Sequence, residues 1–172
     1  MIRPEQETWL AHLDDTNHTD IVAYDPSVLN KFERIKEGIQ SVLGTKREVV
    51  HRGATSLGIS GQGELDIYIL VKAEEFNFLL KQLEGLFGKP GSVYPLERAR
   101  FVTVIDGTKA EVFIVGEESK SWTDGNRFEN YLRKHPMALS KYAELKESGR
   151  GLSTRAYYRR KIEFINSILE KA

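Results

Sequence analysis

Two acidic residues interrupt an apolar stretch near the middle of the chain. The segment "HRGATSLGISGQGELDIYILV" covers residues 51–71, and its run 64–71 is typical of a β-strand although it contains Glu64 and Asp66. Residues two apart on a strand point the same way, roughly 6.5 to 7 Å from each other. An unpaired carboxylate removed from water is strongly disfavoured, so this spacing predicts a cation beside both acids.

A third acid belongs to a later β-rich run. Glu111 lies within "AEVFIV", where Val112 and Ile114 are expected on the opposite face. The chain has no cysteine, so any metal ligands must be oxygen or nitrogen atoms. Three carboxylates suit Mg²⁺ or Mn²⁺, which commonly bridge protein carboxylates to phosphates. The sequence therefore predicts a metal site at Glu64, Asp66 and Glu111. The alternative is solvated acids, with Glu111 paired to Lys109.

The loop before the first acid pair is rich in glycine and hydroxyl groups. Gly53 lets the backbone approach a ligand closely, while Thr55 and Ser56 supply hydroxyl donors for phosphate oxygens. No Gly-Lys-Ser/Thr occurs, and a strand is expected to follow, so neither a Walker A loop nor a dinucleotide fingerprint fits. His51, just before the turn, is a further candidate for phosphate or metal, with a hydrogen-bonded structural histidine as the alternative.

The spacing of these residues resembles the signature of polymerase-beta-type nucleotidyltransferases. In this sequence it consists of Gly53-Ala54, a short loop, and the acid-x-acid pair Glu64 and Asp66. The resemblance implies that Glu64, Asp66 and Glu111 are catalytic carboxylates that hold two metal ions for transfer to a hydroxyl nucleophile.

Longer segments resemble, in order, the characteristic blocks of the GrpB family, which is assigned to the nucleotidyltransferase fold. They are "IVAYDPSVLNKFERIKEGIQSVLG", "HRGATSLGISGQGELDIYI", "FENYLRKHPMALSKYAELK" and "AYYRRKIEFINSIL". In the last block, Tyr157 and Lys161 lie four positions apart on one expected helix face and match a recurring block of that family, and this resemblance makes them candidate phosphate ligands. Arg100, near the start of the second β-rich region, is another candidate. A solvated basic face is the alternative for these positive charges.

The chain departs from the family pattern at several points, among them a loop about one residue shorter and Glu111 at about the position of a histidine. Ala54 stands where the family has a serine, Gly58 where it has a proline, and a Lys-Pro pair is missing. The lost hydroxyl and the lost loop lysine weaken a phosphate site, for which Ser56 could compensate. Glu64, by contrast, completes an acid pair that the usual family pattern often lacks, which favours a metal site here.

The order of expected elements indicates an α+β fold. Residues 24–44 predict a helix capped by Asp25 with Pro26 at its first position, followed by strands near 47–53 and 64–71 and a helix over 73–87. The strand at 64–71 is expected to be buried on both faces. A hairpin around Asp106-Gly107 precedes helices in the last third. We expect one nucleotidyltransferase-like domain over residues 1–172, a mixed β-sheet packed with helices, with a helical C-terminal layer over about 121–172.

Composition excludes several functions. Lysine plus arginine number 25 and aspartate plus glutamate 25, so the formal net charge is zero and general nucleic-acid binding is not expected. The N-terminal stretch is charged, and no run of eighteen apolar residues occurs. A cytoplasmic location without membrane association is therefore expected. No pattern indicates an oligomeric state.

The sequence thus predicts a metal-dependent nucleotidyltransferase that moves a nucleotidyl group from an NTP to an acceptor. A small-molecule or protein acceptor is expected rather than a long nucleic acid, because no second domain for acceptor recognition is evident. The alternative is a catalytically inactive nucleotide- or phosphate-binding module of the same fold, motivated by Ala54 and the missing loop lysine. A protein-interaction role for the charged C-terminal helices is a further, less supported alternative.

Overall fold

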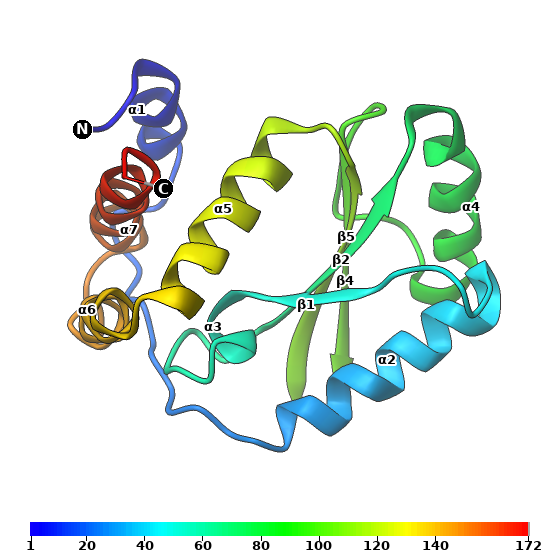
Figure 1. Ribbon diagram of the computed structural model, residues 1–172, viewed down its shortest axis with the longest axis horizontal. Helices are drawn as coiled ribbons and strands as arrows, with labels where there is room; N and C mark the ends of the chain where they lie inside the picture. Colours follow the sequence, from blue (N-terminus) through cyan, green and yellow to red (C-terminus); the bar gives the residue numbers. More distant parts are fainter. Residues whose placement is uncertain (172) are drawn as a thin grey trace. The chain divides into compact units, whose positions relative to one another are not determined.

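A computed structural model describes residues 1–171 and divides the chain into two compact units. Within the described residues, one unit consists of residues 1–23, 59–62 and 124–171, and the other of Tyr24–Gly58 and Gly63–Thr123. The first is helical and the second contains the sheet (Figure 1). The chain was expected to form one domain over residues 1–172. The division into two compact units does not test that expectation, which stays a prediction.

A five-stranded mixed sheet forms the centre of the second unit. Its strands are β1 (Val50–Arg52), β2 (Leu65–Val71), β3 (Ser92–Tyr94), β4 (Arg98–Ile105) and β5 (Thr108–Gly116), in the order β1-β2-β5-β4-β3. β2 and β5 are parallel, whereas the other neighbouring pairs are antiparallel. The predicted α+β class with a mixed sheet is therefore confirmed, although β3 was not predicted.

The tight turn between β4 and β5 is the one that the sequence predicts. Ile105 pairs with Thr108, so only Asp106 and Gly107 connect the strands. Their φ angles are 47° and 74°, and two successive positive φ angles are typical of a type I′ turn. The turn sets the register of β5 and thereby the position of Glu111.

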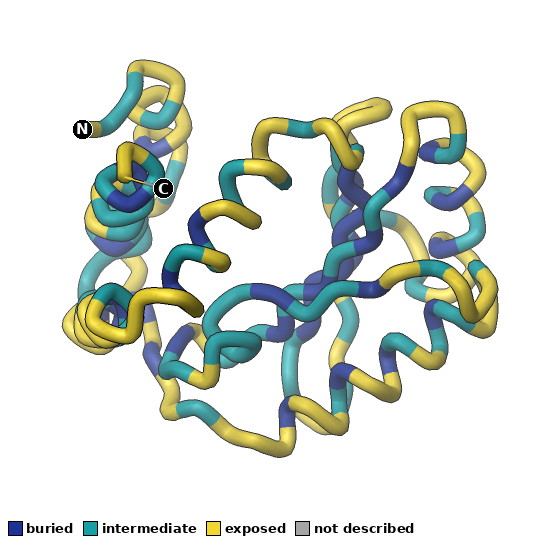
Figure 2. Tube along the Cα trace, viewed as in Figure 1, coloured by how far each residue is buried: buried dark blue, intermediate teal, exposed yellow. Residues whose placement is uncertain are grey.

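Two helices cover one face of this sheet. They are α2 (Val28–Leu43) and α4 (Phe76–Phe87), the latter preceded by the short 3₁₀ helix η1 (Ala73–Glu75). On α2 the buried residues Phe32, Ile35 and Ile39 recur at helical spacing and belong to the same apolar core as residues of β2 and β5. Figure 2 shows buried and exposed positions alternating along this helix. Burial of this apolar surface fixes which face of β2 and β5 is covered, and therefore which face carries the acids.

Two expectations about local structure are wrong. Asp25 does not cap α2, because its carboxylate accepts hydrogen bonds from the backbone N–H and hydroxyl of Ser27, which takes the N-cap position. β2 is not fully buried on both faces, since buried and partly buried residues alternate along it. The strand with consecutive buried residues is β5, from Ala110 to Val115, because it lies between β2 and β4.

The other unit is built mainly from helices. It contains α1 (Pro4–Ala11), α6 (Pro136–Glu147), α7 (Thr154–Leu169) and, from Asp124 onward, α5 (Lys120–Lys134). Trp9 on α1 contacts Tyr158 on α7 edge to face, and Phe128 on α5 meets Tyr142 on α6 in the same way. The predicted helices of the last third are thus confirmed. None of the helices within residues 1–171 combines the length and apolar character needed to cross a membrane.

Candidate cation site

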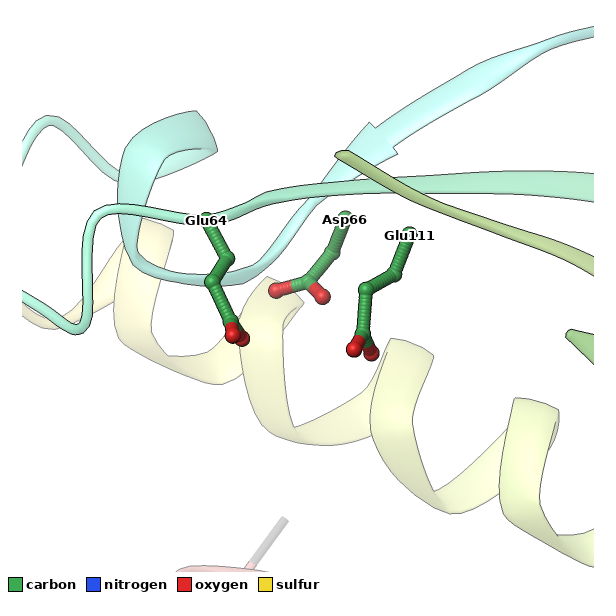
Figure 3. A group of neighbouring side chains, drawn as sticks. All are labelled: Glu64, Asp66 and Glu111. Atoms are coloured by element: carbon green, nitrogen blue, oxygen red, sulfur yellow. The ribbon is translucent and has the colours of Figure 1, made fainter. Parts of the chain in front are cut away.

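The three predicted acids converge on one face of the sheet. Asp66 on β2 lies opposite Glu111 on β5 in the parallel register, and Glu64 comes just before β2. Each of the three offers a carboxylate oxygen that lies within 4.8 Å of the others. Their side chains extend to the same side of the strands (Figure 3). The structure therefore brings together the residues for which the sequence predicts a shared cation.

Two basic side chains already contact this acidic cluster. The Lys109 ammonium lies 2.7 Å from Oε1 of Glu64 and 2.8 Å from Oε1 of Glu111. Arg100 donates from Nη1 to the same Glu111 oxygen at 3.2 Å. Partial burial opposes the charged form of Lys109, but the hydrogen bonds to Glu111 and Glu64 outweigh it and raise the lysine pKa. The cluster thus holds a protein cation between two of its carboxylates.

Arg100 and Lys109 reach the acids because of strand alternation. Lys109 lies two residues before Glu111 on β5, so both side chains point to the same face. Arg100 pairs with Phe113, two residues after Glu111, in the β4–β5 ladder. The structure therefore places Arg100 beside the acids, while its phosphate role stays a prediction. The second role of Lys109, as a partner of Glu64, was missed, although its spacing from Glu111 was a usable signal.

The glycine-rich segment begins with one helical turn, α3 (Gly53–Ser56), where a loop was expected. Gly53 has φ +77° and its backbone lies against the carboxylate of Asp66. The Ser56 hydroxyl donates to the Gly53 carbonyl, and the Thr55 hydroxyl donates to the Glu64 carbonyl. These contacts hold the turn against the start of β2, while the phosphate roles of Gly53, Thr55 and Ser56 stay predictions.

His51 is separated from the acids by the sheet. It pairs with Ile67 in the β1–β2 ladder, and Ile67 belongs to the apolar core under the helices. Its ring stacks on Phe32 of α2 with centroids 4.9 Å apart, and its Nε2 lies 2.9 Å from the Thr55 hydroxyl oxygen. The structural alternative accounts for these contacts, and a phosphate role for His51 stays a prediction.

Arg52 is a buried basic residue of this face that sequence reasoning did not single out. It pairs directly with Asp66 in the antiparallel ladder, so the two side chains leave the same face of the sheet. Its guanidinium carbon lies 4.7 Å from the ring centroid of Trp122 and 5.4 Å from that of Tyr68. Burial beside two aromatic rings holds this positive charge in place. The register of β1 against β2 is what places Arg52 beside Asp66, and this register could not be read from the sequence pattern.

Tyr157 and Lys161 belong to the helical unit. Tyr157 is fully buried there, and its hydroxyl accepts a hydrogen bond from Lys146 Nζ at 3.3 Å. The Lys161 ammonium lies 5.0 Å from the ring centroid of Tyr158. The predicted helical spacing of Tyr157 and Lys161 on α7 is observed, while their phosphate role stays a prediction.

The donor set at Glu64, Asp66 and Glu111 fits a small divalent cation. Two oxygens on one octahedral Mg²⁺ lie about 2.9 to 4.2 Å apart, given Mg–O distances near 2.1 Å. The separations here, up to 4.8 Å, require only small side-chain rotations to reach that range. Carboxylate oxygens are also the ligand type that Mg²⁺ and Mn²⁺ prefer. A divalent cation at this position must share Glu64 and Glu111 with Lys109 or displace it.

Fold and site together define an α+β protein whose mixed sheet is covered by helices on one face and carries an acidic cluster on the other. The sequence model of the GrpB protein family matches residues 18–171. The chain belongs to the GrpB family.

A solved structure supports this fold assignment. The chain is similar to the conserved protein GrpB from Enterococcus faecalis, with a TM-score of 0.67 and 20% sequence identity. The match covers 88% of this chain and 96% of that one. A comparison with curated proteins found no significant match.

Proposed function

We propose that this GrpB protein is a metal-dependent nucleotidyltransferase, with Glu64, Asp66 and Glu111 as the ligands of Mg²⁺ or Mn²⁺. The observation that carries the proposal is the convergence of three carboxylates, from β2, β5 and the segment before β2, within 4.8 Å. Negative charges gathered so closely repel one another unless cations neutralise them. Lys109 and Arg100 neutralise part of this charge, and a divalent cation bound together with an NTP would neutralise more of it and bring the phosphates to the acids.

The reaction would transfer a nucleotidyl group to a hydroxyl of a small-molecule or protein acceptor. The acceptor oxygen forms a bond to the α-phosphorus, the bond from that phosphorus to the pyrophosphate oxygen breaks, and the acceptor proton passes to solvent. When bound, the cation supplies Lewis-acid stabilisation of the charge that develops on the phosphate oxygens. Glu64, Asp66 and Glu111 would hold the cation through their carboxylate oxygens.

Asp66 and Glu111 are the ligands that the fold holds most firmly. They are register partners on two adjacent parallel strands, and Glu111 is buried, with 8% of its surface exposed. Glu64 lies outside the strand ladder and is more exposed, so it can adjust when a cation binds. Arg100, next to Glu111, supplies a guanidinium that can bind a phosphate oxygen. These features support a preorganised site with one adjustable ligand.

Thermal stability with and without ligands tests the proposal. We expect Mn²⁺ or Mg²⁺ with at least one of the four NTPs to raise the melting temperature of the wild type by linkage. Asp66→Asn keeps the side-chain volume beside Gly53 and removes the charge, so it should abolish the shift. The matched control is Glu33→Gln, which removes an exposed carboxylate of α2 that is paired with Lys36 and should leave the shift unchanged.

Product analysis then tests for turnover. Release of pyrophosphate from the stabilising NTP in the presence of pooled acceptors, lost in Asp66→Asn and retained in Glu33→Gln, would support nucleotidyl transfer. The proposal would be contradicted if the melting temperature of the wild type stayed the same with each of the four NTPs in the presence of either metal. Stabilisation without any pyrophosphate release over a broad acceptor panel would instead favour a binding module of the same fold.

A further inference from the structure

Lys109 is placed where it can act as an internal cation. It lies on β5 just after the Asp106-Gly107 turn, and its ammonium contacts Glu64 and Glu111, which come from separate parts of the chain. The two nitrogen–oxygen distances of 2.7 and 2.8 Å direct two of its three N–H donors to these carboxylates. The lysine therefore joins two of the three proposed metal ligands.

When an ammonium and a divalent cation contact the same carboxylate oxygens, each binds them more weakly than it would alone. Both need to lie between Glu64 and Glu111 to be neutralised by them, and they repel each other at such distances. Glu111 is the most buried of the contacting groups, with 11% of its side chain exposed, so it needs a cation partner whether or not metal is present. The Lys109 side chain is 43% exposed and has a route into solvent.

We propose that Lys109 is an exchangeable counter-cation that holds the acidic cluster together without metal and competes with the divalent cation for Glu64 and Glu111. This inference rests on the proposed function, since it assigns a role to a residue of the same site. Metal binding shifts the Lys109 ammonium away from the two carboxylates. The flexible side chain then reaches the region above the site, where the phosphates of an NTP would neutralise it.

The competition has a consequence for how ligands bind. Lys109 and Arg100 already pair with the cluster, so a divalent cation alone gains less there than at three unpaired carboxylates. An NTP carries negative charge to the displaced lysine, so cation and nucleotide should bind with positive coupling. Removal of the lysine charge should strengthen binding of the metal alone and weaken this coupling.

The test is a titration of the full chain with Mn²⁺ alone, in which free hexaaqua Mn²⁺ is measured by electron paramagnetic resonance. We expect Lys109→Gln to lower the Mn²⁺ dissociation constant about tenfold, because one unit charge no longer opposes the metal. Lys109→Arg keeps the charge and should bind Mn²⁺ as the wild type does. The matched control is Lys36→Gln on α2, which removes a lysine paired with Glu33 and should leave the constant unchanged.

The outcomes separate this inference from the proposed function. If wild type and Lys109→Gln bind Mn²⁺ equally, or the variant binds it more weakly, the competition is wrong while the metal site stands. If neither the wild type nor the variant binds Mn²⁺, both the competition and the metal site are wrong. Binding by Lys109→Gln with none by the wild type would support the strongest form of the competition.

A second measurement uses the wild-type chain and so does not depend on the folding of a variant. An amine-acylating reagent is applied with and without Mn²⁺, and the modification of each lysine is quantified by mass spectrometry. We expect Mn²⁺ to increase the acylation of Lys109 relative to Lys36, because the metal releases its ammonium from both carboxylates. Unchanged or reduced acylation of Lys109 at saturating Mn²⁺ would overturn the competition.

Discussion

The carboxylate of Asp66 lies directly against the backbone of Gly53. A Cβ atom added at position 53 would overlap Oδ2 of Asp66 and lie 3.1 Å from its Cγ. Gly53 also has φ +77°, a conformation that L side chains rarely adopt. The absence of a side chain at position 53 is therefore a condition for the observed position of Asp66 beside Glu111, and it links the glycine turn to the acidic cluster.

Gly53→Ala should both destabilise the chain and displace Asp66. Gly58 offers a matched control, because it has φ +69° but a Cβ atom there would meet no other atom within 4 Å. Strain alone should cost Gly58→Ala about 1 kcal/mol in the free energy of unfolding, and the clash should raise the cost for Gly53→Ala by a further ~1 to 3 kcal/mol. Urea unfolding measures both. Equal losses in the two variants would contradict a tight Gly53–Asp66 contact.

The two-residue turn between β4 and β5 gives a second prediction. Gly107 has φ +74° with open space around it, so Gly107→Ala should cost about 1 to 2 kcal/mol from backbone strain alone. Asp106→Asn should change stability by less than about 1 kcal/mol, because asparagine also tolerates positive φ and the ion pair of Asp106 with Arg34 that it removes is exposed to solvent. Thermal or urea unfolding distinguishes the two. A larger loss for Asp106→Asn than for Gly107→Ala would argue against the type I′ turn.

Local patterns were sufficient to predict most of the elements. The spacing of Phe32, Ile35 and Ile39 indicated α2, and Asp106-Gly107 indicated the hairpin, because both signals lie within a few residues. The start of α2 was wrong because Asp25 bonds to Ser27 in a local turn, a choice that depends on geometry and not on residue type. β3 was missed because three residues are too few to show alternation.

The candidate site could be predicted only in part for a related reason. Alternation along one strand placed Asp66 on a single face, but the pairing of β2 with β5 decides that Glu111 lies opposite Asp66. The same long-range register brings Arg52 beside Asp66 and puts His51 on the covered face. Such register depends on how separate segments fold together, and no pattern within either segment contains it.

The ion pair between α1 and α7 predicts an acid-sensitive contribution to stability. Arg159 donates to both carboxylate oxygens of Glu7, at 2.7 and 2.6 Å. These hydrogen bonds lower the pKa of Glu7 below its ordinary value of 4.5, so folding is favoured above that pH. The contribution is lost as the pH falls below 4.5 and through the lower pKa of the folded state.

Glu7→Gln should therefore reduce the dependence of the melting temperature on pH below about 4.5, with the wild type and the variant converging at the lowest pH. Glu5→Gln on the same helix is the control, since its carboxylate makes only a 3.8 Å contact with Arg3. Melting curves from pH 7 to pH 2.5 give the comparison. A constant difference in melting temperature between the wild type and Glu7→Gln over this whole range would show that protonation of Glu7 does not weaken its ion pair with Arg159.

The buried contact between Tyr157 and Lys146 allows a test of whether the Tyr157 hydroxyl stabilises the fold or binds phosphate. Lys146 is only 4% exposed, and its ammonium donates to the Tyr157 hydroxyl. Tyr157→Phe keeps the ring but removes this acceptor, which should cost about 1 to 3 kcal/mol in the free energy of unfolding. The Tyr158 hydroxyl donates to Gln62 near the surface at 3.4 Å. Its removal in Tyr158→Phe should cost less than about 0.5 kcal/mol in the free energy of unfolding. Urea unfolding tests stability, and the NTP-induced thermal shift of each folded variant tests binding. Equal stability of the two variants, with the shift lost only in Tyr157→Phe, would assign this hydroxyl to the phosphate instead.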